Sequence, residues 1–487
     1  MRKLKDILNK VDSISIHGDL NVEVSTVEFD SRKIQNESLF VAQKGLSFDG
    51  HNFIERAITS GAKSVICEDI PTNLQSGVTY IEVSDSNKAL ALIASNFYNN
   101  PSSKLKLIGV TGTNGKTTIA TLLYELLKNL GYTSGLLSTV KVLIGTKEYS
   151  ATHTTPDSLQ INKYLHQMVQ EGVEYCFMEV SSHGIHQKRT EGLDFVGGVF
   201  TNLTHDHLDY HHSFKEYRDV KKTFFDALPK KAFALVNLDD KNGEFMLQNS
   251  RAKKYTYALK TVADFKVKIL ENQFSGLLLN VDGNEVWTKL IGSFNAYNLL
   301  AVFGVSQILG MDKTEALVGI SQLENVVGRF QHVVSKEGVN AIIDYAHTPD
   351  ALKNVLETIN DIRSGNEQII TVVGCGGDRD KAKRPVMGRI ASLQSSQVIF
   401  TADNPRSENP QTIINEMEAG VDPQNIRKTL SILDREQAIK TAIKFSKKRD
   451  IILIAGKGHE TYQEVNGVRS HFDDFEKVTE LFQTIEI

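Results

Sequence analysis

The spacing of apolar side chains is most regular between residues 105 and 131. Leu105, Leu107 and Ile108 form a short apolar run, and residues 112–118 after it are all polar or glycine. Apolar side chains then recur at helical spacing until Gly131, at Ile119, Leu122, Leu123, Leu126, Leu127 and Leu130. An apolar face at this spacing is typical of a helix packed on a sheet, and glycine is common just past a helix end. The pattern predicts a strand, a polar loop and a helix in succession.

Residues 332–487 alternate short apolar runs with helical spacing. The runs at residues 369–373, 398–401 and 451–455 have the length and composition of buried parallel strands. Between such strands, Thr348 and Pro349 are the residue types of an N-cap and a first helical position, and one helical face follows, with Leu352, Val355, Leu356 and Ile359. The pattern predicts a Rossmann-like α/β domain, although the segment lacks a G-x-G-x-x-G fingerprint in strand-to-helix context.

The first hundred residues contain shorter elements. Apolar runs at residues 38–42 and 64–67 flank an amphipathic stretch at residues 53–58, which is typical of a small α/β domain. A polar break at residues 98–103, with Pro101 at its centre, precedes the strand of the polar loop. We therefore expect an α/β protein of three domains: residues 1–99, 100–331 and 332–487.

The length of the chain agrees with three domains, and its net charge argues against binding to nucleic acid or to an anionic membrane. At about 150 residues per domain, a chain of 487 residues suggests about three domains. Lys and Arg number 55 against 59 Asp and Glu, a net charge of -4, so no overall basic field favours nucleic acid or an anionic membrane.

Cysteine usage and hydropathy indicate the compartment. The three cysteines, Cys67, Cys176 and Cys375, have no C-x-x-C spacing, which argues against a disulfide framework or a zinc ribbon. No apolar signal-peptide core and no run of about 18 apolar residues is found in the sequence. We expect a cytoplasmic protein with reduced thiols and no membrane span.

The polar loop has the composition of a phosphate-binding loop: Gly112, Thr113, Asn114, Gly115, Lys116, Thr117 and Thr118. Glycines let backbone N–H groups converge on phosphate oxygens, and the following helix N-terminus adds partial positive charge. Lys116 is placed to reach the β- and γ-phosphates, and Thr117 or Thr118 to bind Mg²⁺. Val110 stands where G-x-x-x-x-G-K-[ST] requires glycine, so the loop is a variant. The central domain is predicted to be a P-loop-type ATPase.

Two further stretches of the central segment offer metal ligands. Glu179 ends a predicted strand, where ligand sites of α/β sheets form, and a carboxylate there suits Mg²⁺. Residues 201–212 are rich in histidine and aspartate, which would also suit zinc. Because the cluster lacks cysteine and regular ligand spacing, Mg²⁺ with mixed oxygen and nitrogen ligands is an equal candidate. A solvated polar loop stays the third interpretation.

Polar residues also follow the predicted strands of the last segment. Residues 376–379, 403–406 and 456–460 are charged loops, and in a doubly wound sheet such loops converge on one crevice. Each could alternatively be a tight turn. Near the N-terminus, Asp30 and Asp49 begin the short motifs Asp30-Ser31-Arg32 and Asp49-Gly50-His51, which we interpret first as turn and N-cap residues.

Over essentially its whole length the chain resembles the Mur ligase family of peptidoglycan precursor synthesis. The resemblance rests on the variant phosphate loop and on ordered motifs: Glu179-Val180-Ser181-Ser182-His183-Gly184, Asp206-His207-Leu208-Asp209-Tyr210-His211, Phe294-Asn295-Ala296-Tyr297-Asn298, Gly328-Arg329-Phe330, Asp344-Tyr345-Ala346-His347-Thr348-Pro349-Asp350, Asp403-Asn404-Pro405-Arg406 and Gly456-Lys457-Gly458-His459-Glu460. His153 and Gln331 depart from residues common in the family.

The resemblance implies residue roles. Lys116, Glu179, His207 and Lys221 would be catalytic, with Lys221 N-carboxylated and with Thr117, Glu179, His207 and this carbamate around Mg²⁺. ATP would be bound by residues 112–118 together with Asn298, Arg329 and Asp344. A UDP-sugar peptide would be bound by Ser31, Thr154, Thr155, Ser181, Gln187 and Arg189. The incoming amino acid would be bound by Arg379, Asp403, Asn404, Pro405, Arg406, Gly456 and Glu460. From the residues alone, Lys221 is interpreted as an ordinary helix-surface lysine.

The resemblance implies an ATP-dependent ligase that adds meso-diaminopimelate to a D-glutamyl γ-carboxylate through an acyl phosphate, and hence a role in the cell wall, cell shape and cell division. A lysine-adding family member is the alternative. Arg406 favours diaminopimelate, because its guanidinium matches the distal carboxylate that lysine lacks. A non-catalytic nucleotide switch and a folylpolyglutamate-type ligase are further alternatives. We expect small-molecule substrates, no nucleic acid and a monomer.

Overall fold

The computed structural model describes residues 1–45, 48–207 and 210–484. Its N-terminal sheet is five-stranded, with β2 as the antiparallel edge and with the order β2 (Ser13–His17), β7 (Thr79–Val83), β6 (Ala62–Cys67), β5 (Ser38–Val41) and β4 (Thr26–Glu28). Apolar side chains on both faces pack against three helices: α1 (Leu4–Ile7), α2 (Ile54–Thr59) and α3 (Ser86–Phe97). The small α/β fold expected for this part is confirmed.

The central sheet has eleven strands and places the phosphate loop. Strand β8 (Lys106–Thr111) pairs in parallel with β12 (Tyr175–Glu179) on one side and with β13 (Phe195–Phe200) on the other. Beyond β12 lie β9 (Ser134–Leu137), β10 (Lys141–Ile144) and β11 (Lys147–Ser150). Beyond β13 lie β14 (Phe233–Asn237), β15 (Lys253–Ala258), β16 (Phe265–Gln273), β17 (Gly276–Val281) and β18 (Asn284–Thr288), the last three antiparallel to each other.

Helices cover both faces of this sheet. One apolar core includes residues of α4 (Lys116–Asn129), α9 (Ser293–Ile308) and α10 (Lys313–Gln322). The other includes residues of α5 (Ser158–Gln170), α6 (Ser182–His186), α7 (Phe214–Ala227) and α8 (Gly243–Leu247). Because the sheet is buried on both faces, its parallel strands read as nearly continuous apolar runs.

The C-terminal sheet is six-stranded, with the order β19 (Gln331–Val334), β20 (Asn340–Asp344), β24 (Ile451–Ala455), β21 (Ile369–Val373), β22 (Gln397–Phe400) and β23 (Thr429–Ser431). Only β19 is antiparallel among these described strands. Its helices are α11 (Pro349–Ile362), α12 (Lys383–Gln394), α13 (Pro410–Glu418), α14 (Arg435–Phe445) and α15 (Asp474–Thr484). A hairpin of β25 (Tyr462–Val465) and β26 (Val468–His471) follows β24.

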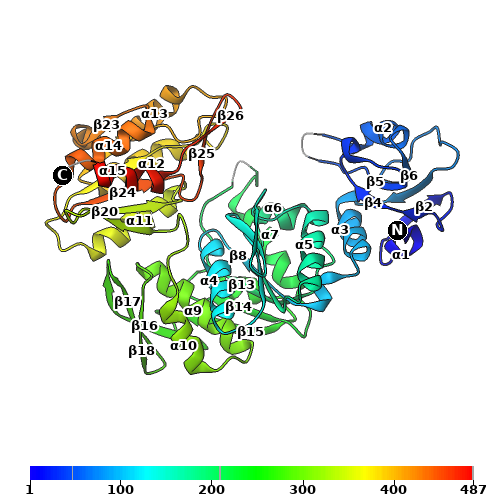
Figure 1. The fold of residues 1–487 in the computed structure, drawn as a ribbon, viewed down its shortest axis with the longest axis horizontal. Helices are drawn as coiled ribbons and strands as arrows, with labels where there is room; N and C mark the ends of the chain where they lie inside the picture. The colour runs from blue at the N-terminus through cyan, green and yellow to red at the C-terminus, as the bar shows by residue number, and fades with distance from the viewer. Residues whose placement is uncertain (46–47, 208–209, 485–487) are drawn as a thin grey trace.

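Figure 1 shows the N-terminal and C-terminal parts on opposite sides of the central part. Several predicted elements are confirmed to the residue: β21 and β24 have the expected bounds, and Thr348 caps α11 by accepting from the N–H of Ala351. Gly131, at φ 87°, follows Leu130, the C-cap of α4.

The short motifs at Asp30 and Asp49 form N-caps in the N-terminal part. Asp30 and Asp49 are N-caps of the 3-10 turns η1 (Ser31–Lys33) and η2 (Gly50–Phe53), as expected. The cysteines are buried free thiols. No helix in the described part of the chain is long and apolar enough to span a bilayer.

Candidate active site

The phosphate loop, residues 112–118, joins β8 to α4 in a conformation that needs glycine. Gly112 and Gly115 have φ angles of 147° and 87°, in the region that disfavours other side chains. A Cβ atom on Gly112 would lie 1.9 Å from Thr201 Oγ1. Helix α4 starts at Lys116 without a side-chain cap, so its first N–H groups face the loop. This is the geometry of an anion site at a helix N-terminus.

Neighbouring strand ends brace the loop. The N–H of Thr113 donates to Asn202 O at 2.8 Å, and the N–H of Asn114 donates to Asn202 Oδ1 at 3.0 Å. Thr201 Oγ1 donates to Asn114 O at 2.6 Å. Residues 201 and 202 follow β13, so the loop is held by the strand next to its own. The phosphate-binding shape is therefore built into the sheet.

Lys116 lies folded over this loop. Its Nζ atom donates to Gly112 O at 3.0 Å and to Thr113 O at 2.7 Å. Burial lowers the pKa of the ammonium, while the Glu179 and Asp206 carboxylates act in the opposite direction. The structure thus places the Lys116 amine beside the phosphate loop, and its contact with the β- and γ-phosphates stays a prediction.

Glu179 ends β12, fully buried, beside the loop. Its Oε2 accepts from Thr117 Oγ1 at 3.0 Å, and its Oε1 accepts from the N–H of Thr139 at 2.7 Å. The structure therefore brings together two of the four residues expected around a metal ion. Carboxylate and hydroxyl oxygens are donors that suit Mg²⁺.

The histidine-rich stretch lies close by, and its Leu208 and Asp209 are outside the described residues. The His207 and His183 rings are 4.8 Å apart, and Asp206 Oδ1 accepts from the N–H of His207 at 2.8 Å. Among the described residues, no three His, Cys, Asp or Glu side chains form a metal-binding group. The expected Mg²⁺ set takes only Glu179 and His207 from those residue types, so the choice between Mg²⁺ and zinc stays a prediction.

Lys221 corrects one interpretation from the sequence. It is not a helix-surface lysine: its side chain is 1% exposed, and Nζ donates to Gly112 O at 2.9 Å. Burial and the nearby Lys116 charge hold the pKa of the ammonium well below its usual value. The signal was present in the sequence, because Tyr217, Lys221 and Phe225 recur every four residues and share the buried face of α7.

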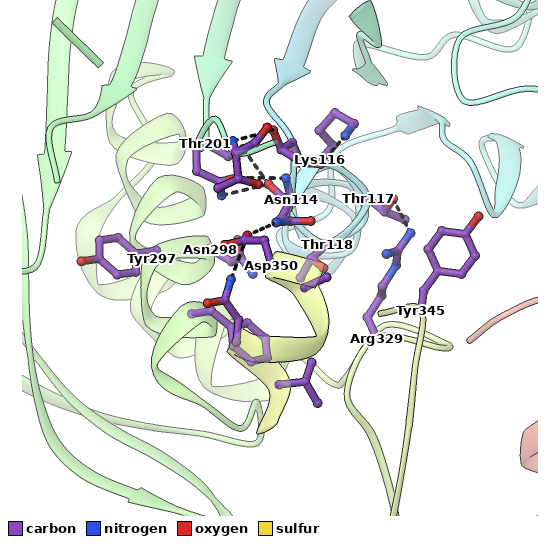
Figure 2. A pocket seen from close by; sticks show the side chains of 18 of the residues that line it. Asn114, Lys116, Thr117, Thr118, Thr201, Tyr297, Asn298, Arg329, Tyr345 and Asp350 are labelled. Carbon is purple, nitrogen blue, oxygen red and sulfur yellow. Dashed lines mark hydrogen bonds between the residues drawn. The ribbon is translucent and has the colours of Figure 1, made fainter. Parts of the chain in front are cut away.

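A cavity of about 570 Å³ joins the phosphate loop to the C-terminal part. Arg329 Nη2 donates to Thr117 Oγ1 at 3.1 Å, and Asn114 Nδ2 donates to Asp350 Oδ2 at 3.0 Å (Figure 2). Asn298 and Asp344 also line it, together with Tyr297, Asn354 and Thr358. All the residues predicted to bind ATP except Gly112 line this one cavity. Asp350 was missed as a site residue, although it ends the motif that begins at Asp344.

The residues expected to bind a UDP-sugar peptide group around the end of β12. Thr155 Oγ1 donates to Glu179 O at 2.8 Å, and Arg189 donates to Thr155 O at 2.6 Å and to Gln187 Oε1. Thr154 accepts from Thr139 Oγ1, and Ser181 caps α6. Ser31 belongs to the N-terminal part, where it is buried in η1. Five of these six residues, all except Ser31, therefore lie together at the end of β12, close to Glu179.

The three charged loops of the C-terminal part converge as predicted. Asn404 Nδ2 donates to Glu460 Oε2 at 2.7 Å, and a Cβ atom on Gly456 would lie 2.4 Å from Asp403 Oδ2. Arg406, at φ 52°, donates from Nη1 to Gly377 O at 2.7 Å. Arg379 and Pro405 belong to the same two loops, at residues 376–379 and 403–406. The loops form one polar site and are not isolated turns.

Glu408, two residues after Arg406, does not pair with it in this structure. Instead, Glu408 binds the buried Arg384 at 2.8 Å and Lys381 at 3.2 Å. These partners, with Arg384 first, lower the pKa of Glu408 to about 2. Lys457, fully buried between Asn404 and Glu460, was not identified from the sequence.

Comparisons with known proteins cover the whole chain. The Mur ligase middle domain matches residues 110–306, the Mur ligase glutamate ligase domain matches 328–458, and the Mur ligase family catalytic domain matches 23–98. UDP-N-acetylmuramoyl-L-alanyl-D-glutamate–2,6-diaminopimelate ligases of Cytophaga hutchinsonii and Bacteroides fragilis are 54% and 52% identical, with 99% of each chain covered. A solved structure of such a ligase is 32% identical with a TM-score of 0.70, over 99% of both chains.

Proposed function

The chain belongs to the Mur ligase family, and on that premise we propose that it joins meso-2,6-diaminopimelate to the γ-carboxylate of UDP-N-acetylmuramoyl-L-alanyl-D-glutamate. ATP is the energy source and leaves as ADP and phosphate. The relatives named for this activity support the proposal, since they match over 99% of the chain. The enzyme is thus an ATP-dependent C–N ligase of peptidoglycan synthesis.

The observation that carries the proposal is the cavity shared by the phosphate loop and the C-terminal part. The phosphate loop lines this cavity together with Arg329 and Tyr345, and the Tyr345 ring lies 4.9 Å from the ring of His459, in the charged loop that ends at Glu460. A ligase that activates a carboxylate with ATP and then needs an amine requires both sites to meet. We assign residues 1–99 to UDP-sugar binding, 100–331 to ATP binding and 332–487 to amino-acid binding.

The first step makes a leaving group. An oxygen of the glutamyl γ-carboxylate attacks the γ-phosphorus, the bond from phosphorus to the β,γ-bridging oxygen breaks, and ADP leaves with that electron pair. Lys116 and the loop N–H groups stabilise the charge on the phosphoryl oxygens. The product is an acyl phosphate.

The second step forms the amide. The neutral amine of diaminopimelate attacks the acyl carbon, a proton leaves the nitrogen, and inorganic phosphate departs from the tetrahedral intermediate. The C-terminal part delivers the amine. Its Asp350, together with Arg329 at the end of the central segment, bonds the phosphate loop, and these contacts keep water from the acyl phosphate.

Mg²⁺ fits the oxygen donors present, and Thr117, Glu179 and His207 would hold it. When bound, the ion supplies charge neutralisation at the phosphates. Lys221 fits N-carboxylation, because CO₂ adds to a neutral amine and burial favours the neutral form. As a carbamate it would offer anionic oxygens beside Gly112. A cytoplasmic location, a monomer and a role in cell division stay predictions.

The test is substrate-dependent ATP hydrolysis. Purified protein should release ADP and phosphate only when the UDP-sugar dipeptide and diaminopimelate are both present, and mass spectrometry should show the tripeptide product. Turnover with lysine in place of diaminopimelate would support the lysine-adding alternative. Hydrolysis that ignores both substrates would support a nucleotide switch and refute the proposal.

A further inference from the structure

Lys457 is a fully buried cation at the centre of the amino-acid loops. It follows Gly456 at the end of β24, and its side chain is 0% exposed. Its Nζ atom donates to Asn404 Oδ1 at 3.2 Å and to Tyr462 O, and it lies 3.5 Å from Glu460 Oε2. Burying an ammonium is costly unless it is paired and hydrogen-bonded. The three oxygen atoms that surround Nζ are therefore held in the positions that satisfy it.

The lysine determines which way the Asn404 amide points. Asn404 Oδ1 accepts from Lys457 Nζ and from the N–H of Glu464 at 2.9 Å, while Nδ2 donates to Glu460 Oε2 at 2.7 Å. An ammonium and a backbone N–H can only donate. Rotating the amide by half a turn would place its NH₂ against two donors and its oxygen against a carboxylate. Lys457 therefore orients Asn404, and Asn404 in turn holds Glu460.

The same lysine anchors the hairpin β25–β26, which supports the Arg406 backbone. The N–H of Arg406 donates to Glu464 O at 3.0 Å, and the N–H of Asn466 donates to Arg406 O at 2.7 Å. These bonds hold Arg406 at a positive φ that a non-glycine residue adopts at a cost. Gln463 Nε2 adds a second tie by donating to Asp403 O at 2.8 Å.

We propose that Lys457 is a positioning residue for the amino-acid substrate: it ties the hairpin β25–β26 to Asn404 and so sets the directions of Arg406 and Glu460. The inference rests on the proposed function, in which these loops receive diaminopimelate. Arg406 then meets the distal carboxylate, and Glu460 and Asp403 meet the distal ammonium. A single buried cation thus aligns the groups that bind the distal carboxylate and the distal ammonium of diaminopimelate.

The test compares KM values for the three substrates in wild type and Lys457→Met, which keeps an unbranched side chain one atom shorter and removes every donor. We expect the KM for diaminopimelate to rise at least about tenfold and the preference over lysine to fall, because recognition depends on aligned polar groups. The KM values for ATP and the UDP-sugar dipeptide should stay within about twofold. Lys444→Met, on the exposed face of α14, is the matched control.

Gln463→Ala keeps the inference testable if Lys457→Met fails to fold. It removes the second tie of the hairpin without leaving a buried charge, and it should raise the same KM by a smaller factor. Equal changes in all three KM values, or an unchanged KM for diaminopimelate in both variants, would overturn the inference. If the wild type used lysine and not diaminopimelate, the proposed substrate would be wrong. The positioning role of Lys457 would then be tested by comparing the KM for lysine between wild type and Lys457→Met.

Discussion

The Nζ atom of Lys221 lies 2.9 Å from the carbonyl oxygen of Gly112, so helix α7 presents a buried amine to the first glycine of the phosphate loop. An unpaired ammonium would be expensive there, and a neutral amine is the form that reacts with CO₂.

Lys221→Ala should lower the ligation rate at least about 100-fold, because an oxygen donor near the metal candidates is lost. ATP binding, measured by titration, should persist. Lys222→Met is the matched control, since Lys222 is also buried on α7 but pairs with Asp226 at 2.6 Å. Added bicarbonate should stimulate the wild type and Lys222→Met but not Lys221→Ala. A Lys221→Ala enzyme with near-normal turnover would refute the carbamate.

Glu179→Gln should lower kcat by about 10²–10³ while the affinity for the UDP-sugar dipeptide changes little, because charge at the phosphoryl step is lost and the shape is kept. The amide oxygen can still accept from the N–H of Thr139. Lys116→Ala should behave in the same way. Isothermal titration with the UDP-sugar dipeptide distinguishes a slower phosphoryl step from weaker substrate binding. A loss of dipeptide affinity as large as the loss of kcat would contradict the assignment of Glu179 and Lys116 to the phosphoryl step.

Arg406→Ala should reduce the preference for diaminopimelate over lysine at least about 100-fold in kcat/KM, because a guanidinium matches the carboxylate that lysine lacks. Its side chain is available for this role, since within the described part of the chain the guanidinium bonds one carbonyl, Gly377 O, and Glu408 pairs with other cations. Arg389→Ala, at an exposed pair with Asp422, is the control. An unchanged ratio of the two kcat/KM values would contradict the assignment.

Asp344 gives a prediction about pH. Burial raises the pKa of its carboxyl from 3.8 to about 6, although Arg329 and the N–H of Phe330 act in the opposite direction. A raised acid pKa means that the folded protein binds the proton more tightly than the unfolded chain. The folded state is therefore penalised fully above pH 6, and the penalty falls as the pH decreases from about 6 to 3.8.

Asp344→Asn should consequently melt at a higher temperature than the wild type above pH 6, and the difference should shrink toward pH 5. Melting temperatures measured between pH 5 and 8 test this. The exposed Asp282→Asn should show no such trend. A difference that does not vary with pH would mean that Asp344 stays ionised throughout the range.

Much of the fold could be predicted because parallel strands buried on both faces read as unbroken apolar runs, as in β21 and β24. The antiparallel strands β16 to β18 were not predicted, since the exposed Lys266 and Lys268 interrupt the apolar positions around the buried Val267 and leave no continuous apolar run. Lys221 was misinterpreted because an ammonium is seldom buried, even though its four-residue spacing from Tyr217 and Phe225 indicated the buried face.

The site was partly predictable for a similar reason. Residues 112–118 form a local motif, whereas the bond from Asn114 to Asp350 joins positions 236 residues apart. Its existence depends on how the C-terminal part packs on the central part, and no spacing within either segment specifies that. Lys457 was missed because its role depends on the hairpin that follows it.

The place of β8 between β12 and β13 also determines when the loop can form during synthesis. The N-terminal sheet has all its strands by Val83, so it can fold while the rest of the chain is still being made. The phosphate loop cannot, because its brace from Thr201 and Asn202 emerges only after both β12 and β13. Closing contacts over such separations costs chain entropy before any bond forms. The nucleotide-binding end of β8 can therefore mature only once Asn202 has been made, well after β8 itself.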